Sequence, residues 1–160
     1  MTFESFLPIS PRLAVARIKL HGVLLSVFSA HAPHEHSHPK SKSLFWEQLR
    51  GALVAATDRG DIVVLLGDFN ARVGSVESPA IGAHDIDNEN SNGFWLRTTL
   101  DSFSLKATST FFPIGFTWTS TRGTHHRLDH ICFSEVLHDM TVESHTLLGH
   151  LSTCQSWQRS

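Results

Sequence analysis

The chain has 160 residues and a mass of 17.8 kDa, the size of one ordinary domain. Hydrophobic residues make up 41% of it and charged residues 18%, so it can bury a core and is not a disordered tail. Thirteen Lys and Arg against 15 Asp and Glu give a formal charge of −2, which leaves no overall positive charge to hold a polyanion. Any contact with nucleic acid must therefore be local.

Twelve histidines qualify this conclusion, because imidazole titrates at about pH 6.5 and affinity for a polyanion can then depend on pH. The cysteines, Cys132 and Cys154, are too few for a disulfide framework, and the apolar run around Cys132 predicts a reduced, buried thiol. No segment approaches the roughly 20 apolar residues of a membrane span, and residues 1–10 lack the pattern of a signal peptide. We expect an intracellular protein without membrane contact.

The first half of the chain predicts a hairpin, a helix and a central strand. Residues 12–20 alternate between apolar and basic positions, and residues 23–30 are β-branched and aromatic, so the short link at His21 and Gly22 predicts an antiparallel hairpin. Apolar residues at three- and four-residue spacing predict a helix over residues 40–57. Residues 61–67 are aliphatic on both faces, which is typical of a strand covered on both sides.

The second half begins with residues 69–92, which are rich in Gly, Ser, Asp and Asn and predict a long surface loop. A helix is expected over residues 94–103. Short strands are expected near residues 107–112, 116–119, 128–133 and 140–145. This order of elements predicts an α/β fold with a mixed sheet and helices against it.

Asp68 and Asn70 stand two residues apart at the end of the predicted central strand. On an extended segment such side chains point the same way, so both converge at the carboxyl edge of the sheet. A carboxylate there can orient and activate a water, and an amide can donate to a phosphoryl oxygen as charge builds. The alternative is that both residues only begin a turn.

Two further residues have a functional and a structural interpretation. Asp129 interrupts an apolar strand, where a carboxylate needs a partner: it either holds a histidine in one tautomer or pairs with Arg127 or Arg122. Trp118 lies in a strand-like segment and can stack on a base or sugar, although packing in the core is the commoner use of tryptophan.

Four histidines lie within residues 31–38. His34, His36 and His38 alternate, so an extended segment would place their imidazoles on one side, where they could bind zinc or copper. No cysteine is nearby, and a solvated loop is the favoured alternative.

Several segments, taken in order, resemble the endonuclease/exonuclease/phosphatase family, specifically the endonuclease domains of non-LTR retrotransposons and the related craniofacial-development-protein-like sequences. They are PISPRLAVARIKL, VFSAHAP, LLGDFNARVG, NSNGFWL leading into TSTFF, FTWTS and HRLDHICFS. They span residues 8–134, which we assign to a partial domain of this family, with residues 135–160 as its divergent C-terminal end. The resemblance implies a partial four-layer α/β sandwich, DNase I-like, with mixed and largely antiparallel sheets.

The resemblance also implies metal-dependent phosphodiester hydrolysis with Mg²⁺ or Mn²⁺ and, in the retroelement branch, nicking of DNA. Asp68 and Asn70 match the family's GDFN pair, and Asp68 is implied as a metal ligand. Asp129 matches the carboxylate that supports a catalytic histidine. His31 stands where the family usually has a phosphate-contacting tyrosine before Ala-Pro, and Trp118 matches a TW element near the active site, so it is assigned to substrate binding.

Two departures from the family pattern shape the functional expectation. The chain begins at the family's middle strands, so the part that supplies the principal metal-binding glutamate is expected to be missing. The family's Ser-Asp-His triplet is also absent, and only Ser144-His145 and Gly149-His150 stand near its place, which leaves the general base unassigned.

We therefore expect a fragment with one of three functions. The first is a nuclease that acts on nucleic acid, with DNA favoured, and is nuclear if active. The second is an inactive retroelement remnant that at most binds, and the third is a histidine-rich metal-binding module. Neither the oligomeric state nor the substrate follows from the sequence.

Overall fold

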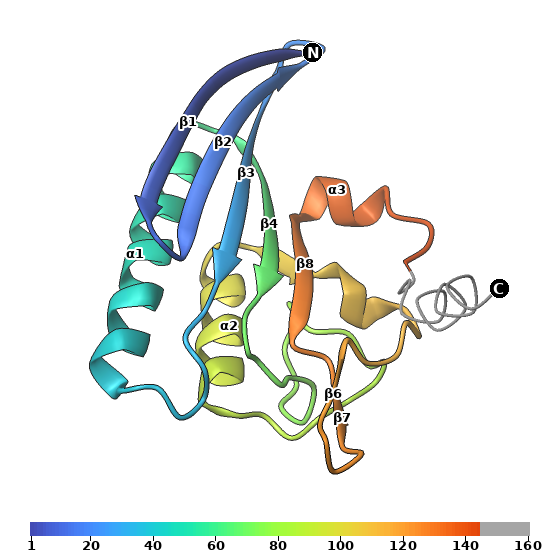
Figure 1. The fold of residues 1–160 in the computed structure, drawn as a ribbon. Helices are drawn as coiled ribbons and strands as arrows, with labels where there is room; N and C mark the ends of the chain where they lie inside the picture. Colours follow the sequence, from blue (N-terminus) through green and yellow to red (C-terminus); the bar gives the residue numbers. More distant parts are fainter. Residues whose placement is uncertain (145–160) are drawn as a thin grey trace, which may run out of the picture.

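A six-stranded sheet forms the centre of the computed structural model, which describes residues 1–144 (Figure 1). Its strands lie in the order β1-β2-β3-β4-β8-β5. Only β3 and β4 are parallel, and the other neighbours are antiparallel. The strands are β1 (Thr2–Ser10), β2 (Leu13–Leu20), β3 (Val23–His31), β4 (Ile62–Asp68), β5 (Leu105–Ala107) and β8 (Asp129–Ser134).

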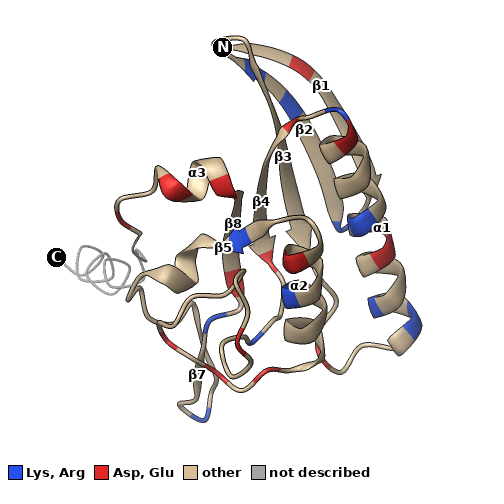
Figure 2. Cartoon of the chain, turned by 180° about the vertical axis from the view of Figure 1, so that it is seen from behind, with Lys and Arg blue, Asp and Glu red and all other residues tan. Residues whose placement is uncertain are grey.

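Two helices cover one face of this sheet, as Figures 1 and 2 show from opposite sides. They are α1 (Pro39–Asp58) and α2 (Ser91–Ser102). The periodic apolar face of α1 buries Trp46, Leu49 and Leu53 completely or nearly so, and the sheet buries Val63 and Leu65 in the same core. Burial of this apolar surface is the main force that holds the two layers together.

The remaining elements are short. They are the 3₁₀ helix η1 (Thr108–Phe111), the strands β6 (Trp118–Thr119) and β7 (His125–His126), which pair as a separate hairpin, and the helix α3 (Glu135–Asp139). No helix within residues 1–144 is both long and apolar enough to cross a bilayer.

The predicted fold class is confirmed, since residues 1–144 form two of the four layers of an α/β sandwich. Within the described residues, the other face of the sheet remains partly exposed, as the register of β4 and β8 shows. Leu65 pairs with Cys132 on the helix side and both are fully buried, whereas Leu66 pairs with Ile131 on the other side and these are 37% and 46% exposed. The prediction of a buried thiol at Cys132 is also confirmed, and burial raises the pKa of that thiol.

The predicted hairpin, both predicted helices and the central strand are confirmed with small differences in their bounds. Strand β1 was not predicted, because this edge strand is exposed along most of its length and therefore has no apolar alternation. The strand expected over 107–112 is wrong: β5 ends at Ala107 and η1 follows. The strand expected over 140–145 is also wrong within the described part, because residues 141–144 have no regular structure; residue 145 lies outside it.

Candidate active site

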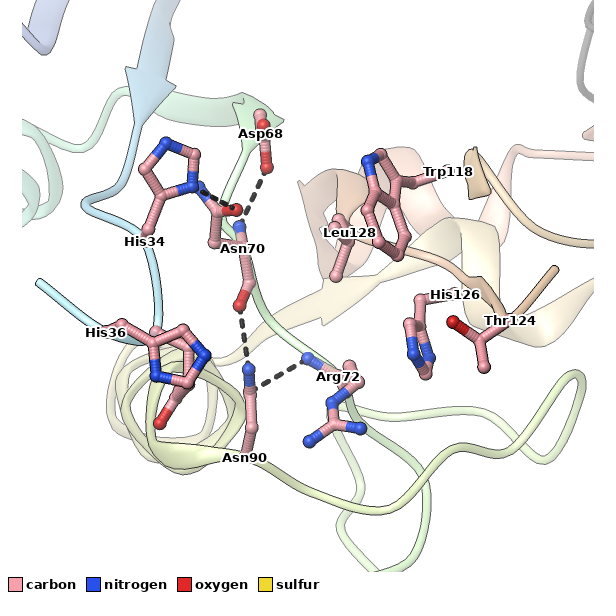
Figure 3. Close-up of a pocket in the computed structure, with 11 residues that line it drawn as sticks. His34, His36, Asp68, Asn70, Arg72, Asn90, Trp118, Thr124, His126 and Leu128 are labelled. Atoms are coloured by element: carbon pink, nitrogen blue, oxygen red, sulfur yellow. Dashed lines mark hydrogen bonds between the residues drawn. The ribbon is translucent and has the colours of Figure 1, made fainter. Parts of the chain in front are cut away.

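The carboxyl ends of β3 and β4 open into a cavity of about 470 Å³ (Figure 3). Four segments meet there: the segment after β3, the loop after β4, the start of α2 and the β6–β7 hairpin. The lining residues are His34, Glu35, His36, Asp68, Asn70, Arg72, Asn90, Trp118, Thr124, His126 and Leu128. The structure therefore brings the predicted residues Asp68, Asn70 and Trp118 to one cavity.

Asp68 is held at the cavity by the close approach of β3 and β4. The backbone φ of Gly67 is +150°, and a Cβ atom at this position would lie 1.8 Å from the carbonyl oxygen of Ala30. Only glycine allows this approach. The backbone N–H of Asn70 donates to Asp68 Oδ1 at 2.8 Å, and Asp68 Oδ2 has no partner among residues 1–144. This second oxygen is free to bind a water or a cation.

Asn70 is 8% exposed and has a φ of +48°, a left-handed conformation that asparagine tolerates better than most residues. Its Nδ2 donates to the carbonyl oxygen of Ala32 at 2.9 Å, and its Oδ1 lies 3.3 Å from His34 Nδ1. One amide hydrogen is thus used within the protein. The other amide hydrogen of Asn70 remains available for the predicted donation to a phosphoryl oxygen.

Asn90 fixes the loop that carries Asn70. It caps the N-terminus of α2, where its Oδ1 accepts from Gly93 N at 2.8 Å and from Arg72 N at 3.0 Å. Its Nδ2 donates to the carbonyl oxygen of Asn70 at 2.9 Å. One side chain therefore ties the start of a helix to the backbone on both sides of Ala71.

Asn92 performs a similar function from within the core, where it is fully buried. Its Oδ1 accepts from Trp46 Nε1 at 3.3 Å, and its Nδ2 donates to the carbonyl oxygens of Pro33 at 2.8 Å and Asn70 at 3.4 Å. Sequence reasoning expected Asn92 and Gly93 at the start of a helix and assigned neither Asn90 nor Asn92 to the site. The signal was present as two asparagines just before a glycine at a predicted helix start.

The opposite side of the cavity is formed by the β6–β7 hairpin. The rings of Trp118 and His126 stack with centroids 5.9 Å apart and an interplanar angle of 13°, and His126 Nδ1 lies 2.5 Å from Asp87 Oδ2. Trp118 is 44% exposed, so the alternative that it packs in the core is wrong. The hairpin therefore presents a flat aromatic surface to the cavity.

Arg127 anchors the base of this hairpin. Its guanidinium is almost fully buried, pairs with Asp85 and donates from Nε to the carbonyl oxygen of Gly115 at 3.1 Å. Desolvation lowers its pKa, and the Asp85 carboxylate opposes that effect. The alternative that Arg127 pairs with Asp129 is therefore wrong.

Arg72 is a functional candidate that sequence reasoning missed. Its side chain lines the cavity, and it forms no ion pair within the described part of the chain. A guanidinium without a carboxylate partner is suited to a phosphate. The signal was the spacing of Asp68, Asn70 and Arg72 at alternate positions after the strand.

Asp129 and His31 lie beside the cavity and do not line it. Both are in register with Asp68, Asp129 across the antiparallel pair β4–β8 and His31 across the parallel pair β3–β4. The Asp129 side chain is exposed and has no histidine or arginine partner within residues 1–144. Its expected support of a catalytic histidine stays a prediction; His145 and His150 lie outside the described residues.

His130 lies beneath the site and is completely buried. Its Nε2 lies 3.0 Å from the carbonyl oxygen of Ala71, and its Nδ1 has no partner in the described part of the chain. Burial lowers the pKa of His130 to about 4, so it remains neutral at physiological pH. We assign it a structural role under the loop that carries Asn70.

The side chains present do not form a complete metal site within residues 1–144, where no three His, Cys, Asp or Glu side chains converge. His38 instead caps α1 by accepting from Lys40 N at 3.2 Å, and His34 faces Asn70. The described residues therefore do not support the hypothesis that His34, His36 and His38 form a metal-binding module. Asp68 alone does not fit a resident divalent cation, which needs several oxygen ligands.

Comparison with known proteins identifies the family. The Endonuclease/Exonuclease/phosphatase family matches residues 2–149, and the chain belongs to it. Craniofacial development protein 2 of Bos taurus is 32% identical over 104 residues, which is 62% of this chain and 17% of that protein. The chain thus spans a small part of that relative.

Solved structures show the same fold. The 3′ phosphatase NExo from Neisseria, bound to a product DNA hairpin, has a TM-score of 0.60 at 20% identity, over 86% of this chain and 61% of that one. The endonuclease domain of TRAS1, a telomere-specific non-LTR retrotransposon, has a TM-score of 0.51 at 18% identity, over 80% of this chain and 52% of that one. At these identities the likeness extends to the fold alone.

Proposed function

We propose that this chain hydrolyses phosphodiester bonds in nucleic acid, with DNA as the substrate, at the cavity that holds Asp68, Asn70 and Arg72. The observation that carries the proposal is the convergence on one cavity of a buried amide with a carboxylate oxygen and a guanidinium that have no partner among residues 1–144. The family of the chain and the DNA bound to NExo support it.

Each group has a distinct part in this proposal. Asp68 Oδ2 orients the attacking water, and the second amide hydrogen of Asn70 donates to a phosphoryl oxygen as negative charge develops there. Arg72 neutralises the phosphate, and the exposed ring of Trp118, stacked on His126, contacts a sugar or base.

We further propose that a divalent cation, Mg²⁺ or Mn²⁺, is required and enters with the substrate. Asp68 would be one of its ligands, and phosphate oxygens and waters would supply the others. No step is assigned to the cation here, because the described side chains do not enclose one. A role in nicking DNA for a retroelement implies action in the nucleus.

The second candidate is an inactive remnant that binds nucleic acid without chemistry. The small number of acidic groups at the cavity favours it. Both functions predict binding through Arg72 and Trp118, and only the first predicts cleavage.

The test is nicking of supercoiled plasmid by the purified chain with Mg²⁺, with Mn²⁺ and with a chelator. We expect metal-dependent nicking that Asp68→Ala abolishes. Asp58→Ala, at the exposed end of α1, is the matched control and should nick as the wild type does. A folded wild-type chain that binds DNA and does not nick it would establish the remnant instead.

A further inference from the structure

His34 lines the cavity, and Asn70 orients its ring. Asn70 Nδ2 donates to the carbonyl oxygen of Ala32 at 2.9 Å, which fixes the amide and turns Oδ1 toward His34 Nδ1, 3.3 Å away. An amide oxygen only accepts hydrogen bonds, so the hydrogen must be on Nδ1. In a neutral imidazole the other nitrogen, Nε2, is then an unprotonated acceptor.

The segment that carries His34 is held firmly against the end of β4. Ala32 and Pro33 are buried, and Ala32 N donates to the carbonyl oxygen of Asp68 at 2.8 Å. The buried amide of Asn92 donates to the carbonyl oxygen of Pro33 at 2.8 Å. The His34 side chain nevertheless remains exposed and lines the cavity (Figure 3). It combines a fixed backbone with an accessible ring.

The other histidines of the region are less suited to act beside Asp68. His31 does not line the cavity, and His130 is buried beneath it. His36 lines the cavity, but its ring forms no hydrogen bond within residues 1–144. His126 is oriented by Asp87, yet it lies on the hairpin side, across the cavity from Asn70.

We infer that His34 is the general base of the reaction, with Asn70 as the residue that positions it; this inference rests on the proposed function. Imidazole is the side chain whose basicity best matches neutral pH. The site thus follows the general arrangement of a base that is oriented by a third group.

The proton and electron movements balance without a further reactant. His34 Nε2 takes a proton from the water that Asp68 orients, and the electron pair of that O–H bond forms the new bond to phosphorus. The bond from phosphorus to the leaving oxygen breaks, and its electron pair stays on that oxygen, which takes a proton from solvent. The imidazolium then releases its proton to solvent and returns to the neutral form.

The first test is the kinetics of His34→Ala on DNA, with and without added imidazole. We expect kcat to decrease on the order of 100-fold or more with little change in KM, and imidazole to restore a measurable part of the rate. His38→Ala, from the same segment but outside the cavity lining, should keep wild-type kcat. Asp68→Ala should be inactive and should not respond to imidazole.

The outcomes separate this inference from the proposed function. A wild-type chain that is active while His34→Ala is equally active, or loses activity that imidazole does not restore, overturns the role of His34 alone. Imidazole rescue of His126→Gln but not of His34→Ala assigns the base to the hairpin and also overturns it. A folded wild-type chain without any activity overturns the proposed function and this inference together.

A second test does not depend on activity. Long-range ¹H–¹⁵N NMR of the protein at neutral pH should show His34 with a hydrogen on Nδ1 and none on Nε2. Asn70→Gly, which keeps the left-handed backbone accessible, should remove that preference. An Nε2-protonated ring in the wild type would contradict the proposed orientation.

Discussion

The two sides of the cavity are built in different ways. On the side of Asp68, the buried amides of Asn70 and Asn92 and the half-buried amide of Asn90 hold the backbone through hydrogen bonds that are largely shielded from water. On the hairpin side, Trp118 and His126 are partly exposed, and the contact of His126 with Asp87 Oδ2 holds their stacked rings in place. Shielded hydrogen bonds fix geometry, whereas exposed contacts yield to solvent and ligand. The chemical groups therefore lie on the rigid side and the substrate-contacting ring on the adaptable side.

The largest loss of stability on the side of Asp68 is expected for Gly67→Ala. The added Cβ would meet a backbone oxygen at 1.8 Å, which no rotamer can relieve, so we expect a loss of about 4 kcal/mol or more in the free energy of unfolding. Urea denaturation measures it. Gly51→Ala is the control, because it lies in α1 with nothing within 4 Å of the new atom, and it should stabilise by about 0.5 to 1 kcal/mol. Equal midpoints for both variants would contradict this account.

Asn92→Ala tests the buried amides directly. It leaves the Trp46 indole N–H and the Pro33 carbonyl oxygen without partners in the core, so we expect a loss of about 3 kcal/mol. Activity should decrease at temperatures where the variant is still folded, because Asn70 loses one of its contacts. Asn88→Ala, an exposed asparagine in the preceding loop, should change stability by less than about 0.5 kcal/mol. A stable Asn92→Ala protein would show that these hydrogen bonds are dispensable.

Acid should weaken the rigid side through His130. Its folded pKa of about 4 is below the value of about 6.5 in the unfolded chain, so the unfolded state binds more protons between these values and stability is lost as the pH decreases. We expect the protonation of His130 to lower the free energy of unfolding by about 2 kcal/mol as the pH decreases from 7 to 5. It is measured as the difference in this pH dependence between wild type and His130→Gln. Identical slopes would contradict the assigned burial of a neutral imidazole.

The smallest effect on stability is expected for the hairpin side. Trp118→Ala removes a ring that is 44% exposed, so the free energy of unfolding should change by less than about 0.5 kcal/mol. Binding of single-stranded DNA should nevertheless weaken by about 1 to 3 kcal/mol, measured by titration. Phe3→Ala, an exposed aromatic on β1 that does not line the cavity, should leave binding unchanged. A large loss of stability at Trp118 would show that both sides are rigid.

The sequence predicted those parts of the molecule whose signal is local. The helix α1 and the strand β4 follow from periodicity and aliphatic content, and the pair Asp68 and Asn70 follows from their position after that strand. Strand β1 could not be predicted in this way, because it is held by pairing with β2 and buries little.

The rest of the site depends on contacts between distant residues. The contact of Asn92 with Trp46 joins positions 46 residues apart, and the pairing of Arg127 with Asp85 joins positions 42 residues apart. Periodicity and spacing contain no information on such pairs. For the same reason the sequence left Asp129 with either a histidine or an arginine as its expected partner, and the described residues show neither.

The sequence Asn92-Gly93 also affects the chemical ageing of this protein. Asparagine followed by glycine deamidates readily in a flexible chain, through attack of the glycine nitrogen on the side-chain amide. In the folded chain, Asn92 is completely buried and the nitrogen of Gly93 donates to Asn90 Oδ1, so the attack is blocked. A deamidated Asn92 would place a carboxylate against two carbonyl oxygens that now accept from its Nδ2. Deamidation of Asn92 would therefore accumulate while the chain is unfolded. A deamidated chain could not re-form the hydrogen bonds that hold its active site.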